Sequence, residues 1–184
     1  MTSKKSTKEH WEKFWKDKNK IEEVYSNEDR IYFNLIKVTD IKEKKILEVG
    51  AGSGRDSFRL AQKRATIYVL DYSPQALCIV KSLNHRYNLS VYLIQGDAFQ
   101  IPIPDERLDI VFHQGLMEHF KDPVPLLKKH SRVLKPGGYL LVDVPQRYHV
   151  YTIIKHILIS VIISLFVENF VYRIIIYSNL SIEG

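Results

Sequence analysis

The chain has 184 residues, of which 45% are hydrophobic and 26% are charged. This length and balance predict one globular domain with at most a small appendage, and they argue against a disordered or fibrous chain. The single cysteine, Cys78, excludes an internal disulfide framework and any zinc site built mainly from thiolates. Because it is flanked by Leu77 and Ile79 in a helical pattern, we expect Cys78 to be a small core residue.

The positive charge is concentrated at the N-terminus. The formal net charge is +6, and residues 1–20 carry seven lysines against three acidic residues. The rest of the chain is close to neutral, so a nucleic-acid partner is not expected. The basic segment has no apolar stretch typical of a secretory signal, and with only one cysteine we expect a cytoplasmic location.

Beyond this leader, short apolar runs alternate with helical patterns. The runs predict strands that are buried on both faces, at residues 45–50, 66–72, 91–96, 108–112 and 139–144. Ser73 and Asp122 each precede a proline and are expected to cap a helix, and residues 135–138 are expected to end the second of these helices. This alternation predicts an α/β fold with a Rossmann-like open, mostly parallel sheet and helices on both faces.

The strongest signal is a glycine-rich turn at residues 46–54 (ILEVGAGSG), where a strand runs into three glycines at alternate positions. Glycine allows a tight turn and a close approach to a ligand, and the helix that follows offers free N–H groups. The dinucleotide fingerprint needs a glycine where the chain has Arg55, and Glu48 places a carboxylate where a pyrophosphate would lie. A ligand with a cationic amine is therefore favoured, and a nicotinamide-dependent oxidoreductase is the least favoured alternative.

Two more acidic residues end the next predicted strands. Asp71 lies about twenty residues beyond Gly50, the position that binds ribose hydroxyls in nucleoside-binding Rossmann folds. Asp97 can accept a hydrogen bond from an adenine amine, while the Ala98 N–H can donate to a ring nitrogen. Acidic residues at three successive strand ends predict a nucleoside site.

With these motifs the chain resembles the class I S-adenosylmethionine-dependent methyltransferases, in the branch of small-molecule and quinone-biosynthesis enzymes. The resemblance rests on residues 46–57, 69–73, 96–120 and 132–145. It implies S-adenosyl-L-methionine as the cofactor, with Asp71 at the ribose, Asp97 and Ala98 at the adenine, and His113 and Gln114 beneath the sulfonium. The full set of expected cofactor-binding residues is Glu48, Gly50, Ala51, Gly52, Gly54, Asp71, Tyr72, Asp97, Ala98, His113 and Gln114.

Methyl transfer from a sulfonium depends more on aligning the two reactants and excluding water from the site than on acid–base groups. No metal is expected. His119 and His113 are the candidates for a general base, and for His119 a purely structural role is the alternative. The leader resembles an aromatic helix that covers the cofactor. Trp11, Trp15, Tyr25 and Tyr32 would then form an aromatic lid, with ordinary packing as the alternative.

The sequence divides into a helical lid segment at 1–30, a cofactor-binding core at 31–145 and an apolar tail at 146–184. The resemblance implies an antiparallel sixth and seventh strand after the core, but only residues 171–177 suggest a strand, so we expect the C-terminal strands to be incomplete. The apolar run at 157–167 is shorter than the ~20 residues of a membrane span. It is either a buried helix, an interfacial helix giving peripheral membrane contact through 150–177, or an oligomer contact.

The function that follows is methyl transfer to a small acceptor, with a hydrophobic acceptor suggested by the tail. The alternative is a truncated, cofactor-binding remnant with little or no catalysis that acts as an interaction partner.

Overall fold

A parallel β-sheet forms the centre of the molecule. The computed structural model describes residues 8–16, 30–146 and 173–180. Within them, six strands form one sheet in the order β3-β2-β1-β4-β5-β6, and every neighbouring pair is parallel. The strands are β1 (Lys45–Val49), β2 (Thr66–Asp71), β3 (Val91–Gln95), β4 (Leu108–Gln114), β5 (Leu134–Gln146) and β6 (Arg173–Leu180). The predicted Rossmann-like fold is confirmed, and the order reverses between β1 and β4.

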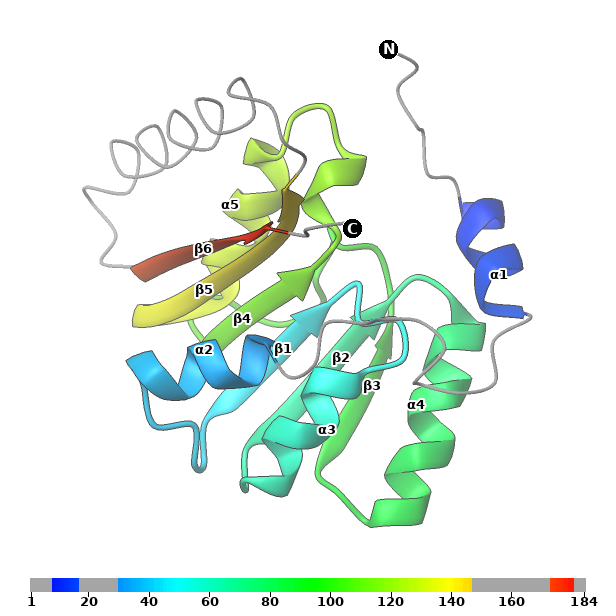
Figure 1. Cartoon of the computed structure of the whole chain (residues 1–184), viewed down its shortest axis with the longest axis horizontal. Helices are drawn as coiled ribbons and strands as arrows, with labels where there is room; N and C mark the ends of the chain where they lie inside the picture. The colour runs from blue at the N-terminus through cyan, green and yellow to red at the C-terminus, as the bar shows by residue number, and fades with distance from the viewer. Residues whose placement is uncertain (1–7, 17–29, 147–172, 181–184) are drawn as a thin grey trace.

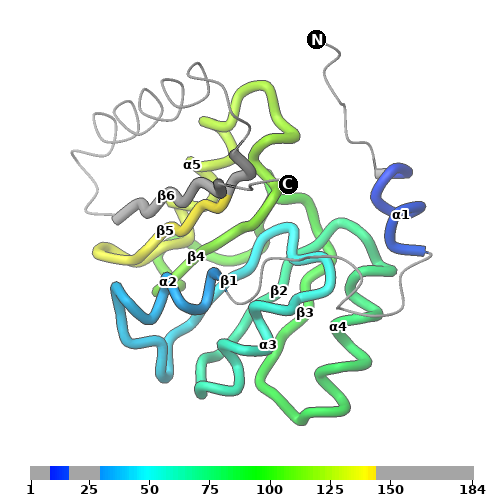
Figure 2. The backbone as a smooth tube through the Cα atoms, in the orientation of Figure 1, coloured from blue at the N-terminus to red at the C-terminus, as the bar shows by residue number. Residues whose placement is uncertain are grey.

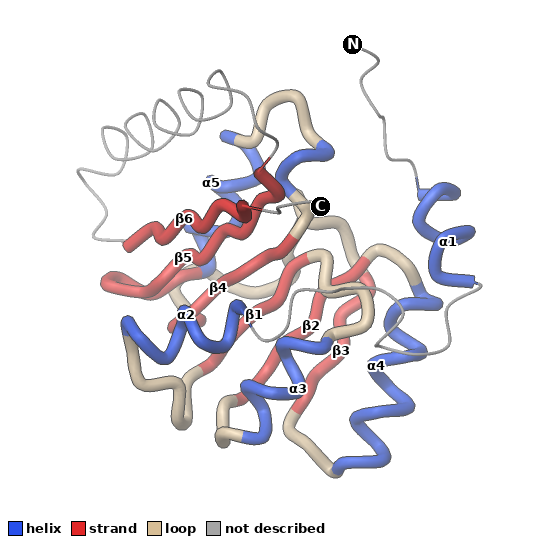
Figure 3. Tube along the Cα trace, viewed as in Figure 1, coloured by secondary structure: helices blue, strands red, loops and turns tan. Residues whose placement is uncertain are grey.

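Helices cover both faces of this sheet. Figure 1 shows α2, α3 and α4 on the near face and α5 on the far face, and Figure 3 shows the strands as the layer between them. The helices are α1 (Lys8–Lys16), α2 (Arg30–Val38), α3 (Arg55–Gln62), α4 (Pro74–Tyr87) and α5 (Val124–Val133), with a short 3-10 helix η2 (Met117–His119). Figure 2 shows α1 beside α4, on the side of the molecule opposite β6.

The alternation of side chains along each strand creates two hydrophobic cores. Ile46 of β1 packs with Leu35 and Phe58 of the near-face helices. Leu47, the next residue, packs with Leu127 and Val133 of α5 on the far face. Because successive side chains point to opposite faces, a strand covered on both sides must be apolar throughout, as the sequence predicted.

The structure confirms one of the predicted helix boundaries and shifts the others. Ser73 caps α4, where its hydroxyl accepts a hydrogen bond from the Ala76 N–H at 3.3 Å. Asp122 accepts from the Val124 N–H at 3.0 Å, but Pro123 occupies the cap and α5 begins one residue later than predicted. Residues 135–138 do not precede the strand but form an irregular part of β5, where the register with β4 shifts.

The prediction for Cys78 is wrong, because its side chain is exposed. α4 buries Ala76, Leu77 and Val80 against the sheet. At 100° per residue, Cys78 follows Leu77 onto the outer side of the helix.

The end of the described chain also differs from the prediction. A strand is present near 171–177, but β6 pairs with β5 in parallel, from Tyr139↔Arg173 to Gln146↔Leu180. The antiparallel arrangement implied by the resemblance is therefore wrong for this strand. The apolar run 157–167 lies outside the described residues. Within the described ranges, every helix is too short or too polar to cross a bilayer.

Candidate functional site

The glycine-rich turn connects β1 to α3 and is held by the end of β2. Gly50, Gly52 and Gly54 all have positive φ, at 65°, 54° and 67°. The Gly50 N–H donates to the carbonyl of Leu70 and the Gly52 N–H donates to Asp71 Oδ2, both at 2.8 Å. These bonds fix the turn at the carboxyl end of the sheet, where parallel α/β folds bind their ligands.

Gly52 is also a point of close approach. A Cβ atom added there would lie 2.5 Å from the indole of Trp15, which is 3% exposed. Only glycine satisfies both the positive φ and this contact. The turn and helix α1 are thus packed directly on each other.

Asp71 joins the turn to α4 through its carboxylate. Its Oδ2 accepts from Gly52, and its Oδ1 accepts from the Ser73 N–H at 2.8 Å. Burial raises the pKa of Asp71, and the backbone donors at Ser73 and Gly52 oppose the rise. Each carboxylate oxygen has a second lone pair, so Asp71 can also accept from a ligand.

A cavity of about 290 Å³ opens beside this turn, at the carboxyl ends of β1 to β4. Many predicted cofactor residues line it: Gly50, Gly52, Asp71, Tyr72, Asp97, Ala98 and Gln114, together with His119. Asp97 is held by its own turn, where its Oδ1 accepts from the Phe99 N–H at 2.9 Å. The switch point between β1 and β4 therefore brings these predicted residues together.

Aromatic rings form a wall of this cavity. Trp11 meets His119 edge to face, with ring centroids 5.1 Å apart, and Phe99 meets Phe120 at 5.0 Å. Trp11 and Trp15 of α1 both line the cavity, as the lid hypothesis requires. Tyr32 of α2 does not line the cavity, because its side chain is buried, with the Arg59 guanidinium of α3 at 4.7 Å from the centre of its ring. Tyr25 lies outside the described residues.

A second, much smaller cavity lies at the same turn. Its lining residues are Glu48, Gly50, Ala51, Ser53, Arg55, Asp56 and Gln114. Glu48 is 5% exposed and accepts a hydrogen bond from the Ser57 hydroxyl. Burial, followed by the nearby Asp56 carboxylate, raises the pKa of Glu48 well above its usual range. Gly54 lines neither cavity and packs on Val80 of α4.

The structure contradicts the expected placement of His113. Its side chain is fully buried on the α5 face, 5.4 Å from the ring of His130, and it lines neither cavity. Burial lowers the pKa of His113 to about 4. The alternation along β4 explains the error, because His113 shares a face with Val111 while Gln114 points to the other side. His113 is therefore wrong both as a base and as a residue beneath the sulfonium.

Sequence reasoning missed several lining residues. In the larger cavity these are Leu70, Gly96, Phe99, Gly115, Leu116 and Phe120, and in the smaller one Ser53, Arg55 and Asp56. Ser53 lies within the glycine turn, and Arg55 and Asp56 directly follow it, so their positions in the sequence were an available signal. The apolar residues carry no such signal, because an isolated Phe or Leu is equally typical of a core.

Comparison with known proteins places the chain in a family. Residues 47–142, just over half of the chain, match the family described as Methyltransferase domain. The chain therefore belongs to this family.

Individual relatives agree with the assignment. A fatty-acid O-methyltransferase of Mycolicibacterium smegmatis is 30% identical over 66% of this chain and 44% of its own length. A ubiquinone biosynthesis O-methyltransferase of Pseudomonas fluorescens is 31% identical over 56% and 45%. A SAM-dependent methyltransferase of Aquifex aeolicus has the same fold, with a TM-score of 0.57, 20% identity, and coverage of 74% of this chain and 71% of that one. The chain thus spans less than half the length of these two curated relatives.

Proposed function

We propose that this chain binds S-adenosyl-L-methionine and transfers its methyl group to a small acceptor. The observation that carries the proposal is the larger cavity, where the glycine turn, Asp71 and Asp97 converge at the switch point of a methyltransferase-family sheet. The methyltransferase relatives support the same assignment.

The residues present suit the chemistry of this cofactor. Asp71 and Tyr72 would hold the ribose, since a carboxylate accepts from vicinal hydroxyls. Asp97 and Ala98 would hold the adenine by one acceptor and one donor. Glu48 and the turn residues Gly50, Ala51 and Gly52 would hold the amino-acid end, with Gln114 between the two cavities.

When bound, the cofactor supplies a methyl group on a sulfonium that is its own leaving group. The chain then has to align the acceptor and exclude water, and alignment alone can contribute ~7–11 kcal/mol toward lowering the barrier. The rings of Trp11, Phe99 and Phe120 line this cavity and would restrict the access of water to it once the ligands are bound. We propose His119 as the general base for an acceptor that must lose a proton, because it is the histidine of the described residues that lines the cavity.

The proposed acceptor is a small molecule with a hydrophobic part. It is supported by the aromatic wall and by the relatives, which are named as a fatty-acid O-methyltransferase and a ubiquinone biosynthesis O-methyltransferase. Residues 1–30 would act as the lid, residues 31–145 as the cofactor-binding core and residues 146–184 as the tail. A cytoplasmic location, peripheral membrane contact through 150–177 and self-association belong to the same proposal, and nucleic acid does not.

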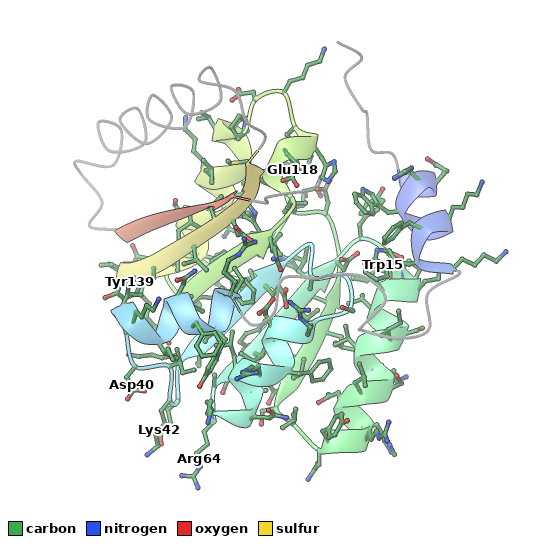
Figure 4. The ribbon with its side chains drawn as sticks, in the orientation of Figure 1. Trp15, Asp40, Lys42, Arg64, Glu118 and Tyr139 are labelled. Carbon is green, nitrogen blue, oxygen red and sulfur yellow. The ribbon has the colours of Figure 1, made fainter. Side chains whose placement is uncertain are left out.

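Calorimetric titration with S-adenosylhomocysteine tests cofactor binding. We expect the wild type to bind and Asp71→Ala to lose at least tenfold in affinity, because Asp71 both faces the ligand and holds Gly52. Asp40→Asn is the matched control, since Asp40 is exposed in the loop before β1 (Figure 4). Absence of binding to the folded wild type would contradict the proposal.

Methyl transfer needs a separate measurement. With labelled S-adenosylmethionine and a lipid extract, we expect label to appear in a small extractable product. Binding without transfer to any acceptor would instead support the cofactor-binding remnant.

A further inference from the structure

Strand β3 forms one edge of the sheet. Among the described strands its neighbour is β2 alone (Figure 1). Its sequence, VYLIQ at 91–95, contains no charged residue and no proline. Charged side chains, prolines and bulges are the usual features that keep an exposed strand edge from pairing with another strand. β3 is therefore suited to accept a further strand.

The backbone groups of β3 alternate between its two sides. In a parallel sheet, every second residue of an edge strand bonds to the neighbouring strand, and the residues between them point outward. The Ser90 carbonyl and the Gly96 N–H both bond to β2, at 3.0 and 3.1 Å. The even-numbered residues of this segment therefore face β2. The backbone groups of Val91, Leu93 and Gln95 point outward.

Part of this outer edge is already occupied. The Val91 carbonyl accepts a hydrogen bond from the Asn84 side chain of α4 at 2.9 Å, and the Val91 N–H donates to the Leu89 carbonyl at 3.1 Å. Within the ranges that the structure describes, no backbone hydrogen bond is made by the outward groups of Leu93 and Gln95. The open edge therefore presents the N–H and C=O groups of two alternate residues.

This open edge is complementary to a second copy of itself. When two copies of β3 run antiparallel with Ile94 opposite Ile94, Leu93 of each copy lies opposite Gln95 of the other. Opposed residues whose backbone groups face each other exchange two hydrogen bonds. The outward N–H groups of both copies then meet the outward carbonyls. A two-fold axis passes between the strands, so the pairing closes at a dimer.

The side chains on the far face suit the same register. Tyr92 is 55% exposed and stacks on Tyr68 of β2, with ring centroids 5.4 Å apart. In the antiparallel register Tyr92 lies opposite Gly96, where an aromatic ring covers the bare backbone of a glycine. Ile94 is on the same face and meets its copy across the axis. The far-face helix α5 packs on β4 and β5, away from this edge.

Charge near the ends of β3 favours the antiparallel direction. Arg86 is exposed in the last turn of α4, shortly before β3, and Asp97 directly follows β3. Antiparallel pairing brings the basic end of each copy toward the acidic end of the other. Parallel pairing would instead bring like charges together, which is unfavourable.

We propose that β3 is a dimerisation edge, at which two copies of this chain pair antiparallel about Ile94 and join their sheets into one. The proposal places self-association at β3, whereas the sequence suggested the apolar run 157–167 as an oligomer contact, and it does not depend on methyl transfer. One strand from each copy makes an interface at the small end of the specific range, so we expect a dissociation constant on the order of 10 µM.

Analytical ultracentrifugation of the full chain over a range of concentrations tests the dimer. Gln95→Pro removes an N–H that β2 does not use, and Tyr92→Lys places a charge beside the axis. We expect the wild type to change from monomer to dimer as its concentration rises, and each variant to weaken the dimer at least tenfold. Ile36→Lys, at a 42% exposed position of α2, is the matched control and should dimerise as the wild type does.

Cysteine cross-linking tests the register. In the proposed pairing the two Cα atoms of residue 94 lie about 4.5 Å apart, which a disulfide can bridge. The two copies of residue 93 are two positions out of register, which puts their Cα atoms beyond the reach of a disulfide. With the exposed Cys78 replaced by Ser, we expect mild oxidation to link Ile94→Cys into a dimer and to leave Leu93→Cys unlinked.

Several results would overturn the proposal. One is a wild type that stays monomeric at all concentrations. Another is a dimer that neither Gln95→Pro nor Tyr92→Lys weakens, because a different surface would then hold it together. Cross-linking at residue 93 in place of residue 94 would exclude this register. Each variant is first checked for thermal unfolding, and if Ile94→Cys does not fold, Gln95→Pro and Tyr92→Lys decide.

Discussion

Glu48 carries a carboxyl group that is almost fully buried in the fold. Glu48 lies one residue before the end of the buried strand β1, and its neighbours Asp56 and Asp71 are acidic. A hydrogen bond from Ser57 only partly offsets the effect of burial and of these neighbours on its pKa. Retaining such a group weakens the free protein whenever it is ionised. Packing alone gives no reason for a buried carboxyl group at this position, whereas a role in ligand binding does.

Replacing Glu48 by Gln should stabilise the free protein at neutral and alkaline pH. The pKa of Glu48 is raised in the folded state, so the folded wild type binds more protons than the unfolded chain and loses stability as pH rises through that pKa. Gln keeps an acceptor for Ser57 without ionising. We expect the midpoint of urea unfolding of Glu48→Gln to exceed that of the wild type, with the difference growing from pH 5 to pH 8. A difference that does not change with pH would contradict this explanation.

At the scale of elements, helix α1 contributes two tryptophans to the larger cavity. Most residues of α1 are polar, as expected for a lysine-rich leader. Trp15, in contrast, packs against Gly52 and is almost fully buried. The chain has two tryptophans, Trp11 and Trp15, and both line the larger cavity. Ligand binding there should therefore change the intrinsic fluorescence of the protein.

Trp15→Ala should reduce the affinity for S-adenosylhomocysteine about tenfold or more. The substitution removes the side chain that covers the glycine turn, and it opens that side of the cavity to water. A fluorescence titration that follows Trp11 measures the effect. Lys13→Ala, an exposed position on the same helix, is the control and should bind as the wild type does. Unchanged affinity in Trp15→Ala would restrict α1 to a packing role.

At the scale of the whole molecule, long-range polar contacts hold the layers together. Arg30 at the start of α2 forms an ion pair with Asp143 near the end of β5, 113 residues away, and Asp143 is almost fully buried. On the opposite face, His113 of β4 and His130 of α5 are both buried, and their ring nitrogens make no hydrogen bonds within the described residues. These two imidazoles make the packing of α5 sensitive to acid.

The histidine pair predicts a loss of stability as pH falls from about 6.5 to about 4. Burial lowers the pKa of His113 to about 4, and burial with the neighbouring His113 lowers that of His130. In this window the unfolded histidines bind protons and the folded ones do not, so protonation favours unfolding by about 1.4 kcal/mol per unit of pKa difference. The raised pKa values of Glu48, Asp71 and Asp143 act in the opposite direction.

His130→Leu should therefore flatten the pH dependence of unfolding on the acid side. The measurement is urea unfolding at intervals between pH 7 and pH 4.5, with His85→Ala at an exposed position of α4 as the control. A slope equal to that of the wild type would show that other groups govern the acid transition.

The turn chemistry and the periodicity of the chain were enough to predict five strands, the cap at Ser73 and, in the larger cavity, Gly50, Gly52, Asp71, Asp97 and Ala98. These features depend on neighbours in sequence: glycines at positive φ, a serine before a proline, and apolar runs that can only be buried. Acidic residues at successive strand ends converge because parallel strands end at the same edge, which makes Asp71 and Asp97 predictable as a pair. The family resemblance implied Trp11, Trp15 and Gln114.

Other features depend on which segments meet. The sequence does not say which face of β4 receives α5, so the burial of His113 away from the cavity followed only from the packing. Helix α2 was not predicted, and the parallel pairing of β6 with β5 replaced the expected antiparallel one. The contact of Trp15 with Gly52 and the meeting of Phe99 with Phe120 join residues 37 and 21 positions apart.

The sequence by itself therefore determined the strands, the glycine turn and the carboxylates at their ends, because local backbone and side-chain chemistry dictates them. Only the tertiary structure decided which side chains enclose the two cavities and which histidine lines the larger one, because those outcomes depend on the face of the sheet and the packing partner of each side chain. The two carboxylates beneath the turn are the clearest case. Glu48 and Asp56 are eight residues apart, and a strand, a turn and the start of a helix bring them to the same small cavity.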